Sequence, residues 1–377
     1  MSRNTMETNA STLLVKTGKD QSYTIYFEQS FAGLASCLEQ DCHISGRKIC
    51  IVSDSNVFPL YGDDIVKELN GKCVHLTSFI FPAGEKNKTL DIVRDLYEHL
   101  ILEHFERRDL ILALGGGVVG DLAGYAAATY LRGIDFVQVP TTLLSQVDSS
   151  IGGKTGVDFD SYKNMVGAFH QPSLVYMNLN TLKTLDTQQF ACGMGEILKH
   201  GLIKNADYYE WLINHMMEIN DRELPVLLEM VQESCRIKGA VVEKDPTEKG
   251  ERALLNFGHT IGHAIEKVKS PELLHGQCVA LGSVAAAYIS FKRGLLSTEE
   301  FYEIRDMNVG FDLSFLVDGI NSQEILRITK SDKKMDAGRV KFILLKGIGK
   351  AFIDHTVTDE EMLEAIEFLN ADNLEKE

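Results

Sequence analysis

The stretch Leu110-Ile111-Leu112-Ala113-Leu114-Gly115-Gly116-Gly117-Val118-Val119-Gly120-Asp121 decides the fold of the first half of this 377-residue chain. Its first five residues form an apolar run that predicts a β-strand. The glycines predict a tight turn into the small-residue helix Leu122–Thr129. Such a turn lets a pyrophosphate approach the backbone at a helix N-terminus. The spacing departs from GxGxxG, so close packing of helix on strand remains an equal interpretation.

Strand-like and helical runs alternate around that stretch up to about residue 185. This alternation predicts a mostly parallel sheet with crossover helices. After Asp186 the pattern is almost wholly helical, apart from a small hairpin expected at Arg339–Leu345 and Ala351–Asp354. The expected strands are Ser22–Phe27, Lys48–Ser53, Val74–Phe81, Leu110–Leu114, Phe136–Val139 and Leu174–Asn178, with a helix at Thr89–Glu103. The expected later helices are Ala206–Met217, Leu224–Glu243, His259–Lys267, Val279–Arg293, Ser297–Asp306, Ser322–Ile328 and Asp359–Phe368.

Length and composition limit the classes to which the protein can belong. The chain is long enough for two domains, each with its own core, and we place them at residues 1–185 and 186–377. No low-complexity linker separates them, so we expect a cleft between closely packed domains. The net charge is −16, which disfavours binding to nucleic acid or to an anionic membrane.

Cysteines and apolar segments predict the compartment. The seven cysteines form an odd set without a CxxC pair, which indicates reduced thiols rather than a disulfide framework. The N-terminus lacks the apolar core of a signal peptide, and the longest apolar stretch, Cys278–Phe291, is too short to span a bilayer. We therefore expect a cytoplasmic protein.

Histidines and acidic residues form the strongest chemical pattern. His259, His263 and Glu266 fall on one face of a helix by the 3.6-residue period. A third histidine, His275, follows after a short break, and Glu196 lies upstream. One carboxylate with two or three imidazoles suits a catalytic divalent metal, because zinc with three protein ligands keeps a position open for substrate. A pair of histidines alone would more simply be a capped or satisfied core pair, so the wider set carries the metal hypothesis.

Basic residues recur beside glycine-rich or histidine-bearing motifs. Lys154 and Lys163 lie in Gly/Ser/Thr-rich surroundings that suit a phosphate or a carboxylate, because ammonium groups and backbone donors converge there. Any one of these cations is most simply a solvated charge, but together they favour an anion-binding pocket. The later members of the set are Lys199, Lys238, Arg252 and Lys334.

Seven motifs, in order and over nearly the whole chain, resemble 3-dehydroquinate synthase. They are Gly115–Asp121, Arg132–Leu144, Asp148–Val157, Lys163–Phe169, Gly195–Gly201, Arg252–Glu266 and His275–Gly276. The resemblance implies an α/β Rossmann-like NAD-binding domain, an all-α metal- and substrate-binding domain, and an active site in the cleft of a homodimer. It implies NAD⁺ and one divalent ion per subunit, zinc with cobalt able to substitute.

The implied reaction is the second step of the shikimate pathway. It converts 3-deoxy-D-arabino-heptulosonate 7-phosphate to 3-dehydroquinate and phosphate. A transient oxidation acidifies the neighbouring C–H, phosphate is eliminated, the hydride returns, and the opened ring closes again by an intramolecular aldol step.

The resemblance also assigns roles to individual residues. The metal ligands fall on Glu196, His259 and His275, so His263 becomes a substrate-side residue. The NAD contacts fall on Asp54, Glu85, Lys88, Gly117, Val118, Val119, Gly120, Asp121, Thr141, Thr142, Thr181, Leu182, Lys183 and Thr184, with Lys154 and Lys163 near both cofactor and substrate. The residues implied to bind the substrate phosphate are Lys154, Asn164, His263 and Lys334, with Arg132 contributed by the partner subunit. The residues implied to contact the substrate carboxylate, the ring hydroxyls and the metal-bound water are Asp148, Lys199, Lys238, Arg252 and Asn256.

Three positions depart from the family pattern. Gln277 stands where glutamate usually follows His-Gly, Asp186 where proline usually follows Thr-Leu, and Gly195 where alanine is frequent. None is an implied ligand, so the departures leave the expected activity in place.

Other enzymes could carry part of this pattern. Sibling sugar phosphate cyclases share the implied fold, metal triad and NAD; the inosose-forming branch has glutamate in place of Asn256, and the valiolone-forming branch loses both Asn256 and His263. Both residues are present here, which favours the shikimate enzyme. A metal-dependent alcohol dehydrogenase would not explain the phosphate-binding lysines, and a non-enzymatic nucleotide-binding descendant should have lost a ligand or a substrate lysine.

Overall fold

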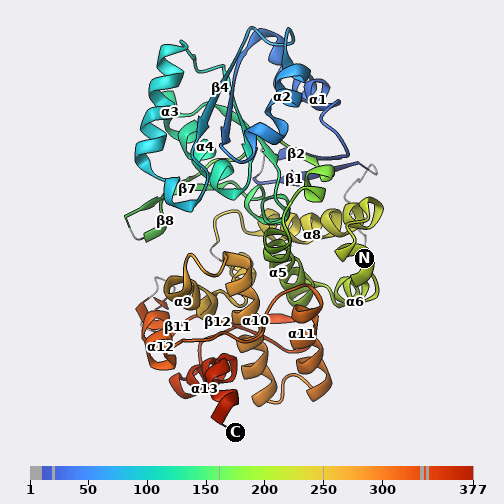
Figure 1. Ribbon diagram of the computed structural model, residues 1–377, viewed down its shortest axis with the longest axis vertical. Helices are drawn as coiled ribbons and strands as arrows, with labels where there is room; N and C mark the ends of the chain where they lie inside the picture. Colours follow the sequence, from blue (N-terminus) through green and yellow to red (C-terminus); the bar gives the residue numbers. More distant parts are fainter. Residues whose placement is uncertain are drawn as a thin grey trace. The chain divides into compact units, whose positions relative to one another are not determined.

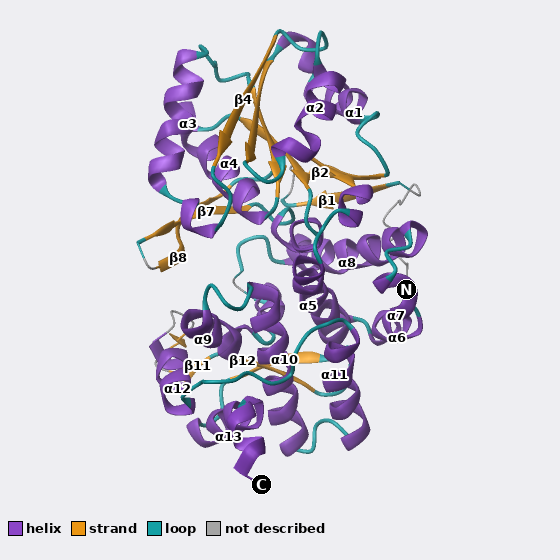
Figure 2. Ribbon diagram, in the orientation of Figure 1, coloured by secondary structure: helices purple, strands orange, loops and turns teal. Residues whose placement is uncertain are grey.

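A seven-stranded sheet forms the centre of the first structural unit, Met1–Leu185 (Figures 1 and 2). The computed structural model describes residues 11–18, 22–160, 162–248, 250–331, 335–336 and 339–376. β1 runs antiparallel to β2, and the other neighbouring strands are parallel. In spatial order the strands are β1 (Thr12–Lys16), β2 (Ser22–Glu28), β9 (Leu174–Asn178), β6 (Asp135–Pro140), β5 (Leu110–Gly115), β3 (Lys48–Asp54) and β4 (His75–Phe81).

Helices cover both faces of this sheet, and each face has its own core. α1 (Leu34–Cys42) and α2 (Phe58–Leu69) pack on one face, while α3 (Leu90–Leu102) and α4 (Gly117–Thr129) pack on the other. Every residue of β5 is buried between these layers, which explains its unbroken apolar run. The mostly parallel sheet with crossover helices that the sequence predicted is confirmed.

The expected strands were found, and three features of this unit differ from expectation. β1 was not predicted. α4 begins at Gly117 rather than at Leu122, because the glycines after Gly116 continue directly into the helix. A separate hairpin of β7 (Lys154–Phe159) and β8 (Tyr162–Phe169) occupies a segment that the sequence analysis treated as an anion-binding loop.

The second unit, Asp186–Glu377, is mostly helical. The helix expected over Ala206–Met217 is broken at His215, and α10 begins at His275 instead of Val279. The helices are α5 (Thr187–Lys204), α6 (Ala206–Asn214), α7 (Met216–Asn220), α8 (Leu224–Lys244), α9 (His259–Lys269), α10 (His275–Lys292), α11 (Thr298–Gly310), α12 (Ser322–Ser331) and α13 (Asp359–Leu369). The short strands are β10 (Met335–Asp336), β11 (Arg339–Val340), β12 (Phe342–Leu345) and β13 (Ala351–Asp354).

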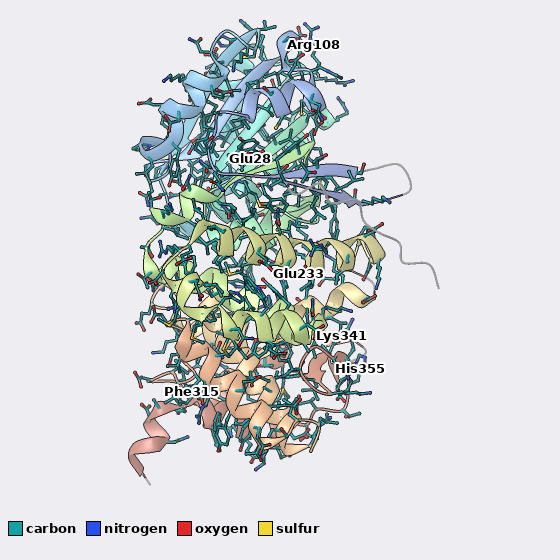
Figure 3. All side chains as sticks on the ribbon, turned by 90° about the vertical axis from the view of Figure 1, so that its right-hand side faces the viewer. Glu28, Arg108, Glu233, Phe315, Lys341 and His355 are labelled. Carbon is teal, nitrogen blue, oxygen red and sulfur yellow. The ribbon has the colours of Figure 1, made fainter. Side chains whose placement is uncertain are left out.

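The expected hairpin corresponds to β12 and β13, which pair antiparallel. Lys341 and His355, labelled in Figure 3, directly precede β12 and follow β13. This unit therefore contains strands beside its helices, where the fold class inferred from the resemblance had helices alone. Among the described residues, no helix is long and apolar enough to cross a membrane. All seven cysteines are free thiols.

Close packing of α5, α9 and α10 positions the candidate site of this unit. Gly258 precedes α9 with φ 77°, and a Cβ there would lie 2.4 Å from Ser283 Oγ on α10. A Cβ on Gly276 would lie 1.9 Å from the Cys192 carbonyl oxygen on α5. Only glycine fits these crossings, so the three helices approach more closely than side chains would allow.

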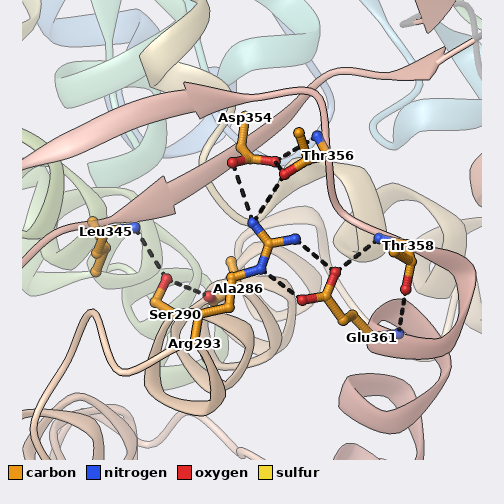
Figure 4. A network of polar contacts seen from close by, with 8 residues as sticks. All are labelled: Ala286, Ser290, Arg293, Leu345, Asp354, Thr356, Thr358 and Glu361. Atoms are coloured by element: carbon orange, nitrogen blue, oxygen red, sulfur yellow. Dashed lines mark hydrogen bonds and ion pairs between the residues drawn. The ribbon is translucent and has the colours of Figure 1, made fainter.

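A network centred on Arg293 ties the end of α10 to β13 and α13 (Figure 4). Its guanidinium donates two hydrogen bonds of 2.6 Å to the Glu361 carboxylate and one of 3.2 Å to Asp354. Hydrogen bonding from Arg293 lowers the pKa of Glu361. Burial would raise the pKa of Asp354, but hydrogen bonds from Thr356 and the charge of Arg293 bring it below its usual range. Both lowered values mean that the ionised forms stabilise this unit.

Replacing Arg293 with alanine should therefore destabilise the protein by about 2 kcal/mol, because the paired carboxylates lose a bidentate partner. The contribution is complete near pH 7 and disappears as the pH falls through the lowered pKa values, below about pH 4. Denaturant unfolding at pH 7 and pH 3.5 measures both effects. Arg94→Ala is the control: that arginine is 76% exposed, so its loss should change stability by less than about 0.5 kcal/mol. Equal stabilities of the two variants would contradict the assigned role.

Candidate active site

Glu196, His259 and His275 meet in the helical unit, from α5 and from the first residues of α9 and α10. The Nε2 atoms of His259 and His275 lie 3.7 and 3.8 Å from the same oxygen of Glu196, Oε1. Glu196 is completely buried, and its Oε1 accepts no hydrogen bond from the part of the chain that the structure describes. The expected carboxylate and two of the imidazoles thus share one small region.

The second nitrogen of each imidazole faces an acceptor. Nδ1 of His259 lies 3.0 Å from the Phe257 carbonyl oxygen, and Nδ1 of His275 lies 3.0 Å from Oε2 of Glu266. A carbonyl oxygen can only accept, so Nδ1 of His259 carries the hydrogen. Nδ1 of His275 likewise carries the hydrogen when the Glu266 carboxylate is ionised, because that carboxylate can then only accept. Both Nε2 lone pairs then face a carboxylate oxygen.

This donor set fits a divalent cation. Three acceptor atoms converging on one another repel unless a positive charge lies between them. Ligand atoms of a tetrahedral zinc ion lie about 3.4 Å apart, close to the two distances above. A histidine whose other nitrogen donates to a carbonyl or carboxylate is the usual arrangement of a metal ligand. The residues present therefore suit zinc or a similar ion.

His263 lies one helical turn after His259 and belongs to the same cluster. One ligand atom from each of His259, His263 and His275 lies within 4.8 Å of the other two. The ring centroids of His263 and His259 are 5.0 Å apart. Geometry alone therefore allows a three-histidine set as well as the set containing Glu196, and variants must separate them.

Lys199 adds a buried cation to this cluster. It lies one turn after Glu196 on α5, is 2% exposed, and its ammonium contacts Oε2 of Glu196. Lys238 is also buried, on α8, which packs against α5. A buried cation beside the carboxylate balances its charge in surroundings of low dielectric.

The segment Glu251–Asn256 brings two more of the expected residues to α5 and α8. Arg252 is 2% exposed and donates to the Pro246 carbonyl oxygen at 2.6 Å. The side-chain amide of Asn256 donates to Oε1 of Glu248 at 2.7 Å. This contact fixes which end of the amide is the donor, so its carbonyl oxygen is oriented as well. Glu248 was not predicted as a site residue. Its position shortly before Arg252, as an acidic residue, could have indicated it.

In the α/β unit, the predicted cofactor residues cluster where β5, β6 and β9 end. A Cβ on Gly116 would lie 3.2 Å from the Thr142 side chain, and one on Gly117 would lie 3.2 Å from Ser149 Oγ. Gln146 donates to Thr181 Oγ1 at 3.3 Å. These contacts place the start of α4 beside Thr142 and Ser149, and Gln146 of the same segment beside Thr181. Ligands of parallel α/β sheets bind at this edge.

Among the described residues of this unit, Lys88 is the most buried cation, at 3% exposed. Its ammonium donates to Asp121 at 2.6 Å and to the Asn164 side-chain oxygen at 2.5 Å, and lies 4.0 Å from Glu85. Burial alone would lower the pKa of Lys88, but Asp121 and Glu85 outweigh it and raise the pKa. Burial also raises the pKa of Glu85, against the charge of Lys88. Asn164, expected at the phosphate, here contacts Lys88.

The remaining expected residues differ in burial and in local role. Asp54 Oδ1 accepts from the backbone amides of Asn56 and Val57 at 2.8 and 2.9 Å, which is the turn-forming role. Lys154, Lys163 and Arg132 are exposed. The other expected cofactor and substrate residues are Val118, Val119, Gly120 and Asp148, on or beside the start of α4, and Leu182 and Lys183 in the turn after β9. Lys334 lies outside the described residues.

The three departures from the family pattern have local structural explanations. Asp186 caps α5 by accepting from the Gln189 amide at 2.8 Å, a role that proline cannot fill. Gln277 accepts from the Leu274 amide at 2.9 Å at the start of α10. A Cβ on Gly195 would lie 2.5 Å from the Gly276 carbonyl oxygen, so glycine suits the close crossing in this chain.

A Rossmann-like unit joined to a helical unit in which two histidines meet a buried glutamate defines a class: two-domain enzymes that combine a dinucleotide cofactor with a catalytic divalent metal. Residues 78–192 match the family described as 3-dehydroquinate synthase N-terminal, and residues 193–335 match 3-dehydroquinate synthase C-terminal. The chain is 41% identical over 349 residues to a 3-dehydroquinate synthase of Acetivibrio thermocellus, covering 92% of this chain and 96% of the relative. The protein belongs to the 3-dehydroquinate synthase family.

Two solved structures resemble the fold closely. One is the 2-epi-5-epi-valiolone synthase of Streptomyces hygroscopicus with NAD⁺ and Zn²⁺ bound, at 28% identity and a TM-score of 0.86, covering 96% of this chain and 99% of that one. The other is 2-deoxy-scyllo-inosose synthase with carbaglucose-6-phosphate, NAD⁺ and Co²⁺, at 27% identity and a TM-score of 0.84, covering 94% and 99%. Both are sugar phosphate cyclases, as the resemblance implied.

Proposed function

We propose that this protein is a 3-dehydroquinate synthase, converting 3-deoxy-D-arabino-heptulosonate 7-phosphate to 3-dehydroquinate and phosphate with NAD⁺ and a divalent metal ion. The observation that carries the metal requirement is the convergence of His259 and His275 on the buried Oε1 of Glu196. The family match, the relatives at about 40% identity and the NAD⁺ and metal printed for related cyclases support the whole assignment.

Glu196, His259 and His275 would hold the ion. When bound, it supplies Lewis-acid polarisation of a substrate hydroxyl as that carbon is oxidised. Lys199, whose ammonium contacts the Glu196 carboxylate, would face the same substrate oxygen. His263, which lies in the same cluster, would contact the substrate and not the ion.

The start of α4 with the Thr141–Thr142 and Thr181–Thr184 segments would hold NAD⁺, which would supply reversible hydride transfer with the substrate alcohol. While that carbon is a ketone, the adjacent C–H is more acidic; its proton passes to an oxygen of the substrate's own phosphate, and phosphate leaves with the C–O electron pair. Ring opening then exposes a carbonyl, which the enol carbon attacks to close the carbocycle. The protein contributes mainly by holding one conformer of the substrate.

The substrate phosphate requires cations. Lys154, Lys163, Asn164, His263 and Lys334 form the proposed set, with Arg132 supplied by a second subunit. Leu131 and Arg132 have φ values of 48° and 72° and are exposed. Non-glycine residues rarely adopt positive φ values, and such backbone strain is often found at functional sites. Together with the exposed Arg132 guanidinium, it supports a contact with another molecule. We therefore propose a homodimer, and a cytoplasmic location consistent with seven free thiols.

Substrate choice tests the assignment. The purified protein is given the heptulosonate phosphate, glucose 6-phosphate and sedoheptulose 7-phosphate in parallel, with NAD⁺ and zinc, and released phosphate and carbocycle are measured. We expect turnover of the heptulosonate phosphate alone, because Asn256 and His263 are both present. Turnover of glucose 6-phosphate or sedoheptulose 7-phosphate instead would make this chain a sibling cyclase.

A further inference from the structure

The carboxylate of Glu266 has no part in the function described so far. It lies on α9 at the spacing that places it on the face of His259 and His263, and it is 6% exposed. Its Oε2 lies 3.0 Å from Nδ1 of His275, at the start of the next helix. A buried carboxylate requires a hydrogen-bond or ionic partner, and here the partner is the outer nitrogen of a proposed ligand.

The two histidines therefore differ in their outer contacts. Nδ1 of His259 faces a neutral carbonyl oxygen, whereas Nδ1 of His275 faces a carboxylate. A carboxylate makes the imidazole a stronger electron donor at its other nitrogen and also fixes the tautomer. His275 is also the more exposed ring, with 32% of its side chain accessible against 11% for His259, so packing restrains it less.

We propose that Glu266 is a positioning residue that acts through His275. It holds Nδ1–H, aims Nε2 at Oε1 of Glu196 and thereby raises the affinity of the protein for its divalent ion. The proposal rests on the metal role in the proposed function. It assigns no contact between Glu266 and the substrate or the ion.

The test measures metal binding directly. Full-length wild type, Glu266→Ala and Glu266→Gln are loaded with Zn²⁺, and affinity is obtained by competition with a chromogenic chelator. We expect a 10- to 100-fold weaker affinity for Glu266→Ala, and a smaller loss for Glu266→Gln, because its amide oxygen can still accept from Nδ1–H. The Co²⁺-loaded proteins should show a changed visible spectrum for the alanine variant, and a spectrum near wild type for the glutamine variant.

Glu272→Gln is the matched control, since Glu272 lies just after α9 with 74% of its side chain exposed and pairs only with Lys269 among the contacts described. It should bind Zn²⁺ as wild type does. Melting curves of the metal-free proteins separate a folding defect from a binding defect, and the isosteric glutamine variant keeps the test usable if the alanine variant is unstable.

Two results would overturn the proposal. One leaves the proposed function in place, and the other contradicts it as well. If wild type binds one ion and both Glu266 variants bind it with equal affinity and an unchanged Co²⁺ spectrum, Glu266 does not position His275, and the proposed function stands. If wild type itself binds no ion at this cluster, the metal role in the proposed function fails together with the proposal.

Discussion

Replacing His275 with alanine should abolish metal-dependent activity while the protein stays folded. The variant removes one of three atoms that converge on the proposed ion, and its side chain is one-third exposed, so little packing is lost. We expect kcat/KM to fall by about 1,000-fold or more, equivalent to about 4 kcal/mol of transition-state stabilisation. Bound zinc, measured after dialysis, should fall well below one per chain.

His263→Ala is the informative comparison, because His263 lies in the same cluster on the same face of α9. If the ligands are Glu196, His259 and His275, this variant should keep its zinc and still lose activity through weaker substrate contacts. Zinc lost from His263→Ala but kept by His275→Ala would contradict the assignment. It would favour a ligand set containing His263.

Replacing Lys88 with methionine should have the second largest effect. Methionine preserves the length and most of the volume of the side chain but leaves Asp121 and Glu85 without their buried cation. Breaking a buried pair in this way costs about 3 kcal/mol. Because Asp121 and Asn164 would lose the contact that orients them, the affinity for NAD⁺ should also fall by about tenfold or more.

Denaturant unfolding and calorimetric titration with NAD⁺ measure these two effects. Lys86→Met, two residues away at an exposed position, is the control and should change stability by less than about 0.5 kcal/mol. Wild-type stability and NAD⁺ affinity in Lys88→Met would show that the cluster around Lys88 supports neither the fold nor the cofactor.

Six of the seven strands of the central sheet were predicted from the sequence, and β5 shows most clearly why; β1 was not predicted. β5 is buried along its whole length, so no alternation of polar residues obscures it. α3 was equally clear: Val93, Leu96 and Leu100 form its buried face and Thr89 caps it. In both elements, burial imposes a pattern that can be recognised without knowledge of the neighbours.

Other elements were not predicted, because their burial leaves no periodic pattern in the sequence. α5 carries Glu196 and Lys199 but was not predicted as a helix, because all residues from Phe190 to Ile203 are buried and no polar face produces a helical period. Its internal glycines also have low helix propensity. The β7–β8 hairpin was missed because most of β8 is exposed and its side chains do not alternate between core and solvent.

The candidate site was predictable as a set of residue types but not as a set of contacts. The histidines and Glu196 stood out by chemistry. The pairing of Lys88 with Asn164 joins residues 76 positions apart, and the contact of Glu248 with Asn256 depends on how one turn folds back. Such contacts are produced by tertiary packing and leave no periodic signal in the sequence.

Phosphate release tests the central claim most directly. The purified protein is incubated with the heptulosonate phosphate and catalytic NAD⁺, with and without a chelator, while absorbance at 340 nm is followed. The account predicts equal amounts of phosphate and dehydroquinate, no net NADH, and loss of turnover on chelation. Phosphate release that continues after the metal has been stripped and dialysed away, or NADH that accumulates with product, would contradict it.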